Sequence, residues 1–156
     1  MWPPPAVVRD IAALARPAVD GLRWTTEDQW HATLRFLGDA DPDDARASFE
    51  AVAAASTTAV MGPATERFGQ ATLHVPIAGL DDVAAEVAGA FGPEERPFRG
   101  HLTLARARPC RGVDLRPLCG VPLAGEWPVT EVTLVASELH PQGARYQVVA
   151  RQLLDR

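Results

Sequence analysis

The spacing of apolar residues predicts three short helices. Apolar positions recur at helical spacing over Val7–Ala15 and over Leu80–Phe91, where Gly92-Pro93 ends the second run. Asp41-Pro42-Asp43-Asp44 is typical of a helix start, because it supplies a capping side chain, a proline at the first helical position and acids in the first turn. We therefore expect helices in the segments 5–15, 42–53 and 80–91.

Between these helices, apolar and β-branched runs bounded by Gly, Pro or Asp predict strands. Gly21–Thr26 is expected to be a short strand or a turn. The other expected strands are Trp30–Leu37, Thr57–Met61, Ala71–Ile77, Phe98–Ala105, Val121–Ala124, Val129–Leu139 and Arg145–Leu153. Helices mixed with hairpin-like groups of strands indicate an α+β fold with largely antiparallel sheets. The length of 156 residues suits a single domain over 1–156, and no linker or low-complexity segment divides it.

One short pattern occurs twice in these strands. His31-Ala32-Thr33-Leu34 and His101-Leu102-Thr103-Leu104 both read His-x-Thr-Leu and lie seventy positions apart. Residues i and i+2 of a strand point to the same face, so each copy presents an imidazole and a hydroxyl together. We expect two lobes, each built on one copy, to face each other across a cleft.

A pair of imidazoles suits proton transfer near neutral pH, one accepting a proton and the other donating one. Hydrolysis of a phosphodiester needs such a pair, and Thr33 and Thr103 can donate hydrogen bonds to phosphate oxygens. Arg106 can add a charge-assisted contact. Strict alternation places Arg106 on the opposite face from His101, so a bulge or the strand end has to turn it inward.

Composition narrows the chemistry further. All fifteen basic residues are arginine, which excludes a lysine nucleophile or a phosphate-loop lysine. The net charge of −5 argues against a general polyanion binder, yet six arginines lie between Arg96 and Arg116 with Asp114 as the single acid. This segment suits an anionic substrate, although a solvated arginine-rich loop has the same composition.

The remaining candidate residues favour ordinary structural roles. No His, Cys or carboxylate spacing is typical of a metal site, and Cys110 and Cys119 are expected to be reduced thiols. His74 and His140 are expected on the surface. Trp24 and Trp30 suit the core or the cleft wall, and alternation places Phe36 in the core. No membrane span or signal peptide is evident, so a cytoplasmic protein is the default.

The paired motifs resemble the 2H phosphoesterase superfamily. The fuller strings, 21–24, 30–38, 97–106 and 144–146, are similar to its bacterial RNA 2′,3′-cyclic phosphodiesterase branch, also called 2′-5′ RNA ligases. The resemblance implies a bilobal fold and hydrolysis of 2′,3′-cyclic phosphate to a 2′-phosphomonoester, without metal or cofactor. It implies His31 as the acid and His101 as the base, although the near-symmetric site leaves the reverse assignment open.

The same resemblance implies phosphate binding by Thr33, Thr103 and Arg106, and nucleoside binding by Phe36. Two departures from the family pattern stand out. Gly100 replaces a usual proline, and the apolar strand usual before the Trp-Pro-Pro stretch is absent. An unpaired edge invites pairing with another chain, so we expect a substitute strand, reduced stability, or a strand-exchanged dimer in place of a monomer.

Three alternatives to hydrolysis of RNA ends remain. A small cyclic phosphate such as ADP-ribose 1″,2″-cyclic phosphate needs the same chemistry, and the ligase reaction is the reverse transesterification at the same site. A non-catalytic module that binds RNA ends belongs to a different functional class. A basic path leading away from the cleft favours RNA, and histidine substitutions separate catalysis from binding.

Overall fold

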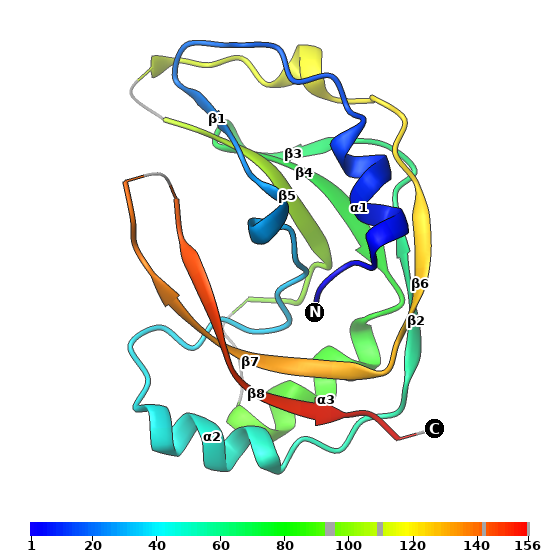
Figure 1. The fold of residues 1–156 in the computed structure, drawn as a ribbon, viewed down its shortest axis with the longest axis vertical. Coiled ribbons are helices and arrows are strands. Elements are labelled where there is room, and N and C mark those ends of the chain that lie inside the picture. Colours follow the sequence, from blue (N-terminus) through cyan, green and yellow to red (C-terminus); the bar gives the residue numbers. More distant parts are fainter. Residues whose placement is uncertain (93–95, 109–110, 142, 156) are drawn as a thin grey trace.

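The computed structural model describes residues 1–92, 96–108, 111–141 and 143–155. Figure 1 shows one large curled sheet, a separate two-stranded hairpin, and helices at the margins. The elements in chain order are α1 (Pro5–Ala12), β1 (Leu22–Trp24), η1 (Glu27–Gln29), α2 (Pro42–Glu50), β2 (Thr57–Met61), β3 (Glu66–Phe68), β4 (Thr72–Ala78), α3 (Asp81–Phe91), β5 (His101–Ala107), η3 (Arg116–Leu118), β6 (Gly125–Val129), β7 (Glu131–Glu138) and β8 (Arg145–Leu153).

All strand pairs are antiparallel within the described part of the chain. The large sheet has the order β1-β5-β4-β2-β6, with β3 paired to β4, and β7 pairs only with β8. This arrangement confirms the α+β class with antiparallel sheets. The second motif strand, β5, occupies the interior of the large sheet between β1 and β4.

The three expected helices form where the apolar spacing predicts them. Helices α1 and α2 each end three residues earlier than expected, and α3 begins one residue later. In α1, a proline occupies the first turn and Val7 and Ile11 face the core. The Asp41 carboxylate caps α2 by accepting hydrogen bonds from the backbone amides of Asp43 and Asp44, at 2.9 and 3.1 Å. Helices α2 and α3 pack on one another at one end of the molecule (Figure 1). None of the described helices is long and apolar enough to cross a bilayer.

The prediction of a strand over Trp30–Leu37 is wrong. This segment forms one isolated bridge, Ala32 to Leu102. The Ala32 amide donates to the Met1 carbonyl at 2.9 Å, and the N-terminal ammonium of Met1 donates to the Ala32 carbonyl at 3.0 Å. A strand needs a partner along its length, and the segment beyond Ala32 has none in the described structure. The apolar pattern instead reflects burial, since Trp30 and Ala32 are each 1% exposed.

Two smaller differences concern strand positions. The sequence pattern predicts no strand between residues 57–61 and 71–77, whereas the structure has β3 there, a three-residue strand paired with β4. The pattern also predicts a strand at Val121–Ala124, but β6 begins at Gly125, and within the predicted segment Pro122 forms an isolated bridge to Ala64. The helix stop at Pro93 falls outside the described residues.

Strand β5 contains a bulge that decides which side chains share a face. On β4, Leu73 pairs with Ala105 and the next residue, His74, pairs with Thr103, so Leu104 is an extra residue on β5. Leu104 and Ala105 are consecutive and both buried, whereas Arg106 is exposed. The alternation is therefore inverted after Leu104, and Arg106 lies on the face of His101 and Thr103.

Candidate active site

The bridge between Ala32 and Leu102 brings the two motifs together. Both residues point into the core, at 1% and 0% exposure, so their neighbours point to the opposite face. Continuing the antiparallel register from this bridge sets His31 across from Thr103 and Thr33 across from His101. Each histidine therefore lies beside the threonine of the other motif, and all four side chains are half-buried on one face.

The two imidazoles are held by the same local hydrogen bond. Nδ1 of His31 lies 2.8 Å from the carbonyl oxygen of Gln29, and Nδ1 of His101 lies 2.8 Å from that of Arg99. A carbonyl can only accept, so each Nδ1 carries the proton and donates it. In the neutral ring Nε2 is then the basic nitrogen, available to a substrate on both histidines.

His31 is enclosed by aromatic rings from the two ends of the chain. Its ring centroid lies 5.1 Å from that of Trp2 and 4.6 Å from that of Tyr146 on β8. Burial lowers the pKa of His31 from 6.5 to about 4, and the positive charges of Arg106 and of a protonated His101 act in the same direction. The imidazole of His31 is therefore neutral at pH 7 in the free protein.

His101 is supported by a different set of groups. The ring of Phe68 on β3 meets it edge-on at 4.9 Å, and the ring of His74 on β4 meets it edge-on at 5.6 Å. Phe68 stacks on His74 at 3.8 Å, and the Arg99 guanidinium lies 4.9 Å from the Phe68 ring centroid. Phe68, His74 and Arg99 thus form a layer behind the second motif.

The prediction that His74 is an ordinary surface histidine is wrong. It is 2% exposed, and its Nε2 lies 4.0 Å from a carboxylate oxygen of Glu66. Burial lowers its pKa from 6.5 to about 4, with contributions from the charges of His101 and Arg99. The ring of Phe68 stacks on His74 and the ring of His101 meets it edge-on, so these neighbours bury a residue that alternation assigns to the solvent face.

Other candidates fall partly as expected. Trp30 is a core residue at 1% exposure, Trp24 is half-buried and His140 is exposed. Phe36 is 79% exposed, so its assignment to the core by alternation is wrong, and the nucleoside-binding role implied by the resemblance stays a prediction. Trp2 and Phe68 were missed as neighbours of the histidines, because only the tertiary fold brings them there.

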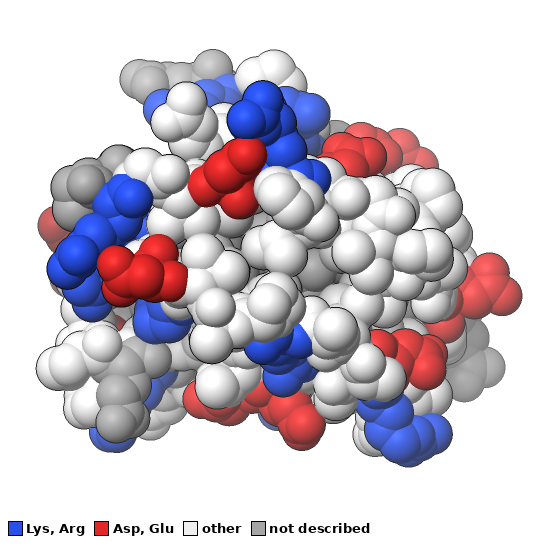
Figure 2. Space-filling view, turned by 90° about the horizontal axis from the view of Figure 1, so that it is seen from above, with Lys and Arg blue, Asp and Glu red and all other residues white. Residues whose placement is uncertain are grey.

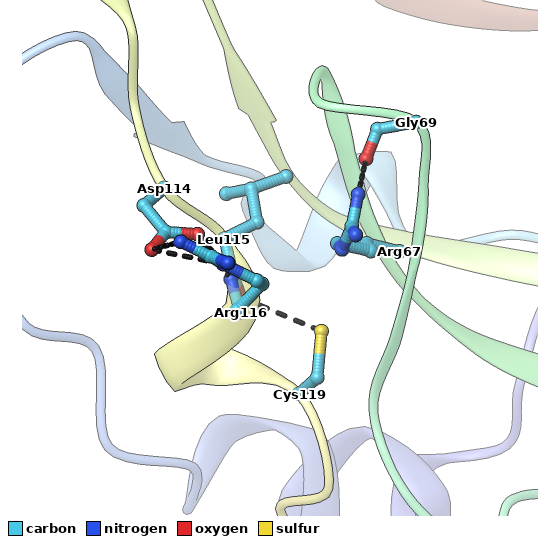
Figure 3. Close-up of polar contacts among 6 residues, drawn as sticks. All are labelled: Arg67, Gly69, Asp114, Leu115, Arg116 and Cys119. Carbon is cyan, nitrogen blue, oxygen red and sulfur yellow. Dashed lines mark hydrogen bonds and ion pairs between the residues drawn. The ribbon is translucent and has the colours of Figure 1, made fainter.

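Carboxylates neutralise part of the positive charge of the arginine-rich segment in the folded protein. Arg116 forms an ion pair with Asp114 at 2.9 Å (Figure 3), and Arg111 forms one with Asp20 at 3.4 Å. On the face shown in Figure 2, acidic and basic side chains are interspersed and separated by uncharged surface. Near the motifs, the charges of the N-terminal ammonium and Arg106 act on His31, and the charge of Arg99 acts on His74.

Cysteine and metal chemistry have little support in the described residues. Cys119 is a free thiol whose Sγ donates to the Leu115 carbonyl at 3.4 Å (Figure 3), and Cys110 lies outside the described residues. Where the structure describes the chain, no three His, Cys, Asp or Glu side chains are grouped to hold a metal ion.

This geometry defines an α+β protein in which the two His-x-Thr motifs lie side by side on one face. Residues 2–62 match the family model described as LigT like Phosphoesterase. An RNA 2′,3′-cyclic phosphodiesterase of Thermus thermophilus is 38% identical over 77 residues, which span 47% of this chain and 35% of that relative.

Solved structures agree over nearly the whole chain. A crystal structure from Thermus thermophilus has 28% identity and a TM-score of 0.70, covering 94% of this chain and 88% of its own. Escherichia coli LigT complexed with 3′-AMP has 23% identity and a TM-score of 0.74, covering 98% and 94%. The same LigT has been solved with NADP+, ATP or phosphate. The chain is therefore similar to LigT-like phosphoesterases over residues 2–62, is distantly homologous to the bacterial RNA 2′,3′-cyclic phosphodiesterase, and shares the fold of E. coli LigT.

Proposed function

We propose that this protein hydrolyses RNA 2′,3′-cyclic phosphate ends to 2′-phosphomonoesters, without a metal, by acid–base catalysis between His31 and His101. Water attacks phosphorus, the bond to the 3′ oxygen breaks, and the 2′ oxygen keeps the phosphate. In 2′-5′ ligation a 5′-hydroxyl replaces the attacking water: it gives its proton to the base, the bond from phosphorus to the 3′ oxygen breaks, and the 3′ oxygen takes a proton from the acid.

The observation that carries this proposal is the equivalence of the two histidines. Each has its Nδ1 proton fixed on the backbone carbonyl two residues earlier, at 2.8 Å, and the Ala32–Leu102 bridge sets the two motifs side by side. Two Nε2 atoms available on one face suit a displacement at a phosphate bound between them, which needs a base for the attacking water and an acid for the leaving oxygen.

The roles follow the family resemblance. Nε2 of His101 accepts a proton from the attacking water, and Nε2 of His31 donates one to the departing 3′ oxygen. His31 is neutral in the free protein because burial lowers its pKa. An anionic phosphate beside it stabilises the imidazolium, so His31 acquires its proton as the substrate binds.

Three further residues suit the phosphate. The hydroxyls of Thr33 and Thr103 lie on the face of the histidines, and the bulge in β5 turns Arg106 to the same face. Hydroxyl and guanidinium donors stabilise the negative charge that grows on the non-bridging oxygens in the transition state. The exposed ring of Phe36 is available to a nucleoside.

Turnover of a nucleoside 2′,3′-cyclic phosphate in EDTA tests the proposal. We expect His31→Ala and His101→Ala each to lower kcat by about 10²- to 10⁴-fold. The double variant should lose little more, because the two groups act as one unit. His140→Ala, at an exposed histidine of the β7–β8 turn, is the matched control and should keep wild-type turnover. Retention of turnover by both single variants at the catalytic histidines contradicts the proposal.

One observation favours a second candidate, a small cyclic phosphate such as ADP-ribose 1″,2″-cyclic phosphate. Ion pairs with Asp20 and Asp114 occupy Arg111 and Arg116, so the arginine-rich segment offers an RNA chain less unpaired positive charge than its sequence suggests. Comparison of kcat/KM for that compound, a nucleoside 2′,3′-cyclic phosphate and a short RNA with a cyclic end separates the two. A preference for RNA that disappears at high salt supports the first candidate.

A further inference from the structure

We propose that Thr25 is a positioning residue that joins the two His-x-Thr motifs through the core and holds Arg106 at the substrate phosphate. The inference concerns a residue outside both motifs, and its catalytic consequence rests on the proposed function. Thr25 follows β1 and is 7% exposed, so water does not compete for its hydroxyl.

The Thr25 hydroxyl contacts both motifs. The indole Nε1 of Trp30, the residue before His31, donates to Thr25 Oγ1 at 3.0 Å. Thr25 Oγ1 lies 2.9 Å from the carbonyl oxygen of Thr103 and 2.8 Å from that of Leu104. An indole N–H only donates and a carbonyl only accepts, so the Thr25 hydroxyl accepts a hydrogen bond from Trp30 and donates one to β5.

These two carbonyls belong to the bulge that orients Arg106. Leu104 is the extra residue of β5 opposite β4, and a bulge leaves such a residue without its regular ladder partner. Thr25 provides partners from β1 instead, because its backbone amide also donates to the Leu104 carbonyl at 2.9 Å. The bulge inverts the alternation, so whatever stabilises it also keeps Arg106 on the face of His101.

Loss of the Thr25 hydroxyl removes the acceptor of the Trp30 indole N–H and the hydroxyl donor to the Thr103 and Leu104 carbonyls, all in a buried site. Thr25→Val preserves the shape of the side chain and removes only the hydrogen bonds, whereas Thr25→Ser preserves the hydroxyl. We expect Thr25→Val to lower kcat/KM by about 10- to 100-fold. Thr25→Ser should stay within about 3-fold of wild type.

A double-mutant cycle separates positioning from general loss of structure. If Thr25 acts through Arg106, the Thr25→Val/Arg106→Gln double variant has the same kcat/KM as Arg106→Gln alone. Losses that multiply in the double variant, or a Thr25→Val protein with wild-type kcat/KM, would overturn the proposal.

Thr65 provides a matched control. It is 3% exposed, its hydroxyl donates to the Leu118 carbonyl at 2.6 Å and accepts from the Val121 amide at 3.1 Å, and it makes no contact with either motif among the described contacts. Thr65→Val should lower the unfolding temperature as Thr25→Val does, while kcat/KM stays at the wild-type value.

A crystal structure of Thr25→Val tests the positioning role independently of any turnover. We expect the register of β5 against β4 to change between Leu73 and His74, and the Arg106 side chain to leave the face of His101. An unchanged bulge and an unmoved Arg106 would refute the inference. Failure of the wild type to hydrolyse cyclic phosphates refutes the proposed function and leaves this structural comparison decisive for Thr25.

Discussion

At the scale of single residues, the two histidines proposed as the catalytic pair, His31 and His101, make the same kind of hydrogen bond and differ in their surroundings. Both donate from Nδ1 to a carbonyl at 2.8 Å, which fixes the same tautomer in each. His31 packs against Trp2 and Tyr146, whereas His101 meets Phe68 and a second imidazole, His74. Burial among these rings lowers the pKa of His31 to about 4, so the environment of this imidazole favours its neutral form in the free protein.

The low pKa of His31 leads to a prediction about proton uptake. His31 has a pKa of about 4 in the free protein, so it is mostly neutral at pH 5.5. A bound phosphate anion raises that pKa, so binding should draw between about 0.5 and 1 proton from solution per site. Calorimetric titration of His101→Gln protein, which leaves the ligand intact, with a nucleoside 2′,3′-cyclic phosphate in buffers of different ionisation enthalpy measures this uptake.

The control is the His31→Gln/His101→Gln protein. The cyclic phosphate keeps a single charge across this pH range, so any uptake that remains in the double variant comes from another group. Equal proton uptake with and without His31 would show that His31 does not become charged when phosphate binds, and would remove it as the acid.

At the scale of elements, the sequence predicts most helices and strands correctly. The helix starting at Pro42, the strand Thr57–Met61 and the strand ending at Leu153 appear with the expected bounds at those points. Local signals set them, namely a proline-containing cap and runs of β-branched residues. The parity of Arg106 requires either a bulge or the strand end to turn it toward His101, and the structure contains a bulge at Leu104.

The failures at this scale come from interactions that a local pattern does not contain. Trp30–Leu37 has the apolar content of a strand, yet strand structure depends on a neighbour, and the segment forms a single bridge at Ala32. His74 and Phe36 illustrate the same limit for burial. Alternation assigns a side chain to a face of a strand, but it does not show whether other residues cover that face. The face of β4 that carries His74 is covered next to β5, and His74 is 2% exposed, whereas Phe36 is left 79% exposed.

Gly100 offers a prediction about how β5 is anchored. A Cβ at this position would lie 2.1 Å from the Ile77 carbonyl oxygen, and the Gly100 carbonyl accepts from the Ile77 amide at 2.9 Å. Gly100→Ala should therefore displace the strand start next to His101, lowering the free energy of unfolding by about 1–3 kcal/mol. Urea denaturation and turnover measured together should both show the loss.

Gly89, in α3, is the matched control. A Cβ there meets no atom within 4 Å, so Gly89→Ala should raise the free energy of unfolding by about 0.5–1 kcal/mol. Its turnover should stay at the wild-type value. A Gly100→Ala protein as stable and active as wild type would mean that the Ile77 contact does not set the position of β5.

At the scale of the whole molecule, buried histidines make stability depend on pH. His31 and His74 each have a folded pKa of about 4, below the unfolded value of 6.5. Between these values the unfolded chain binds more protons, so the free energy of unfolding falls as the pH falls. From pH 7 to pH 5 each histidine should account for about 2 kcal/mol of that loss.

Urea denaturation at pH 7 and pH 5 tests this dependence. His74→Gln should reduce the difference between the two pH values, and His140→Gln, at an exposed position, should leave it unchanged. The same difference in His74→Gln and wild type would show that His74 is not the buried neutral group described here.

The central claim, that two opposed imidazoles open a 2′,3′-cyclic phosphate, is tested most directly by the regiochemistry of the product. Phosphorus NMR of a nucleoside 2′,3′-cyclic phosphate incubated with the protein in EDTA distinguishes the two monoesters. We predict the 2′-monophosphate alone, formed by the wild type and lost in His101→Ala. A 3′-monophosphate, a mixture of the two, or a reaction that persists in His101→Ala would contradict this account of the site.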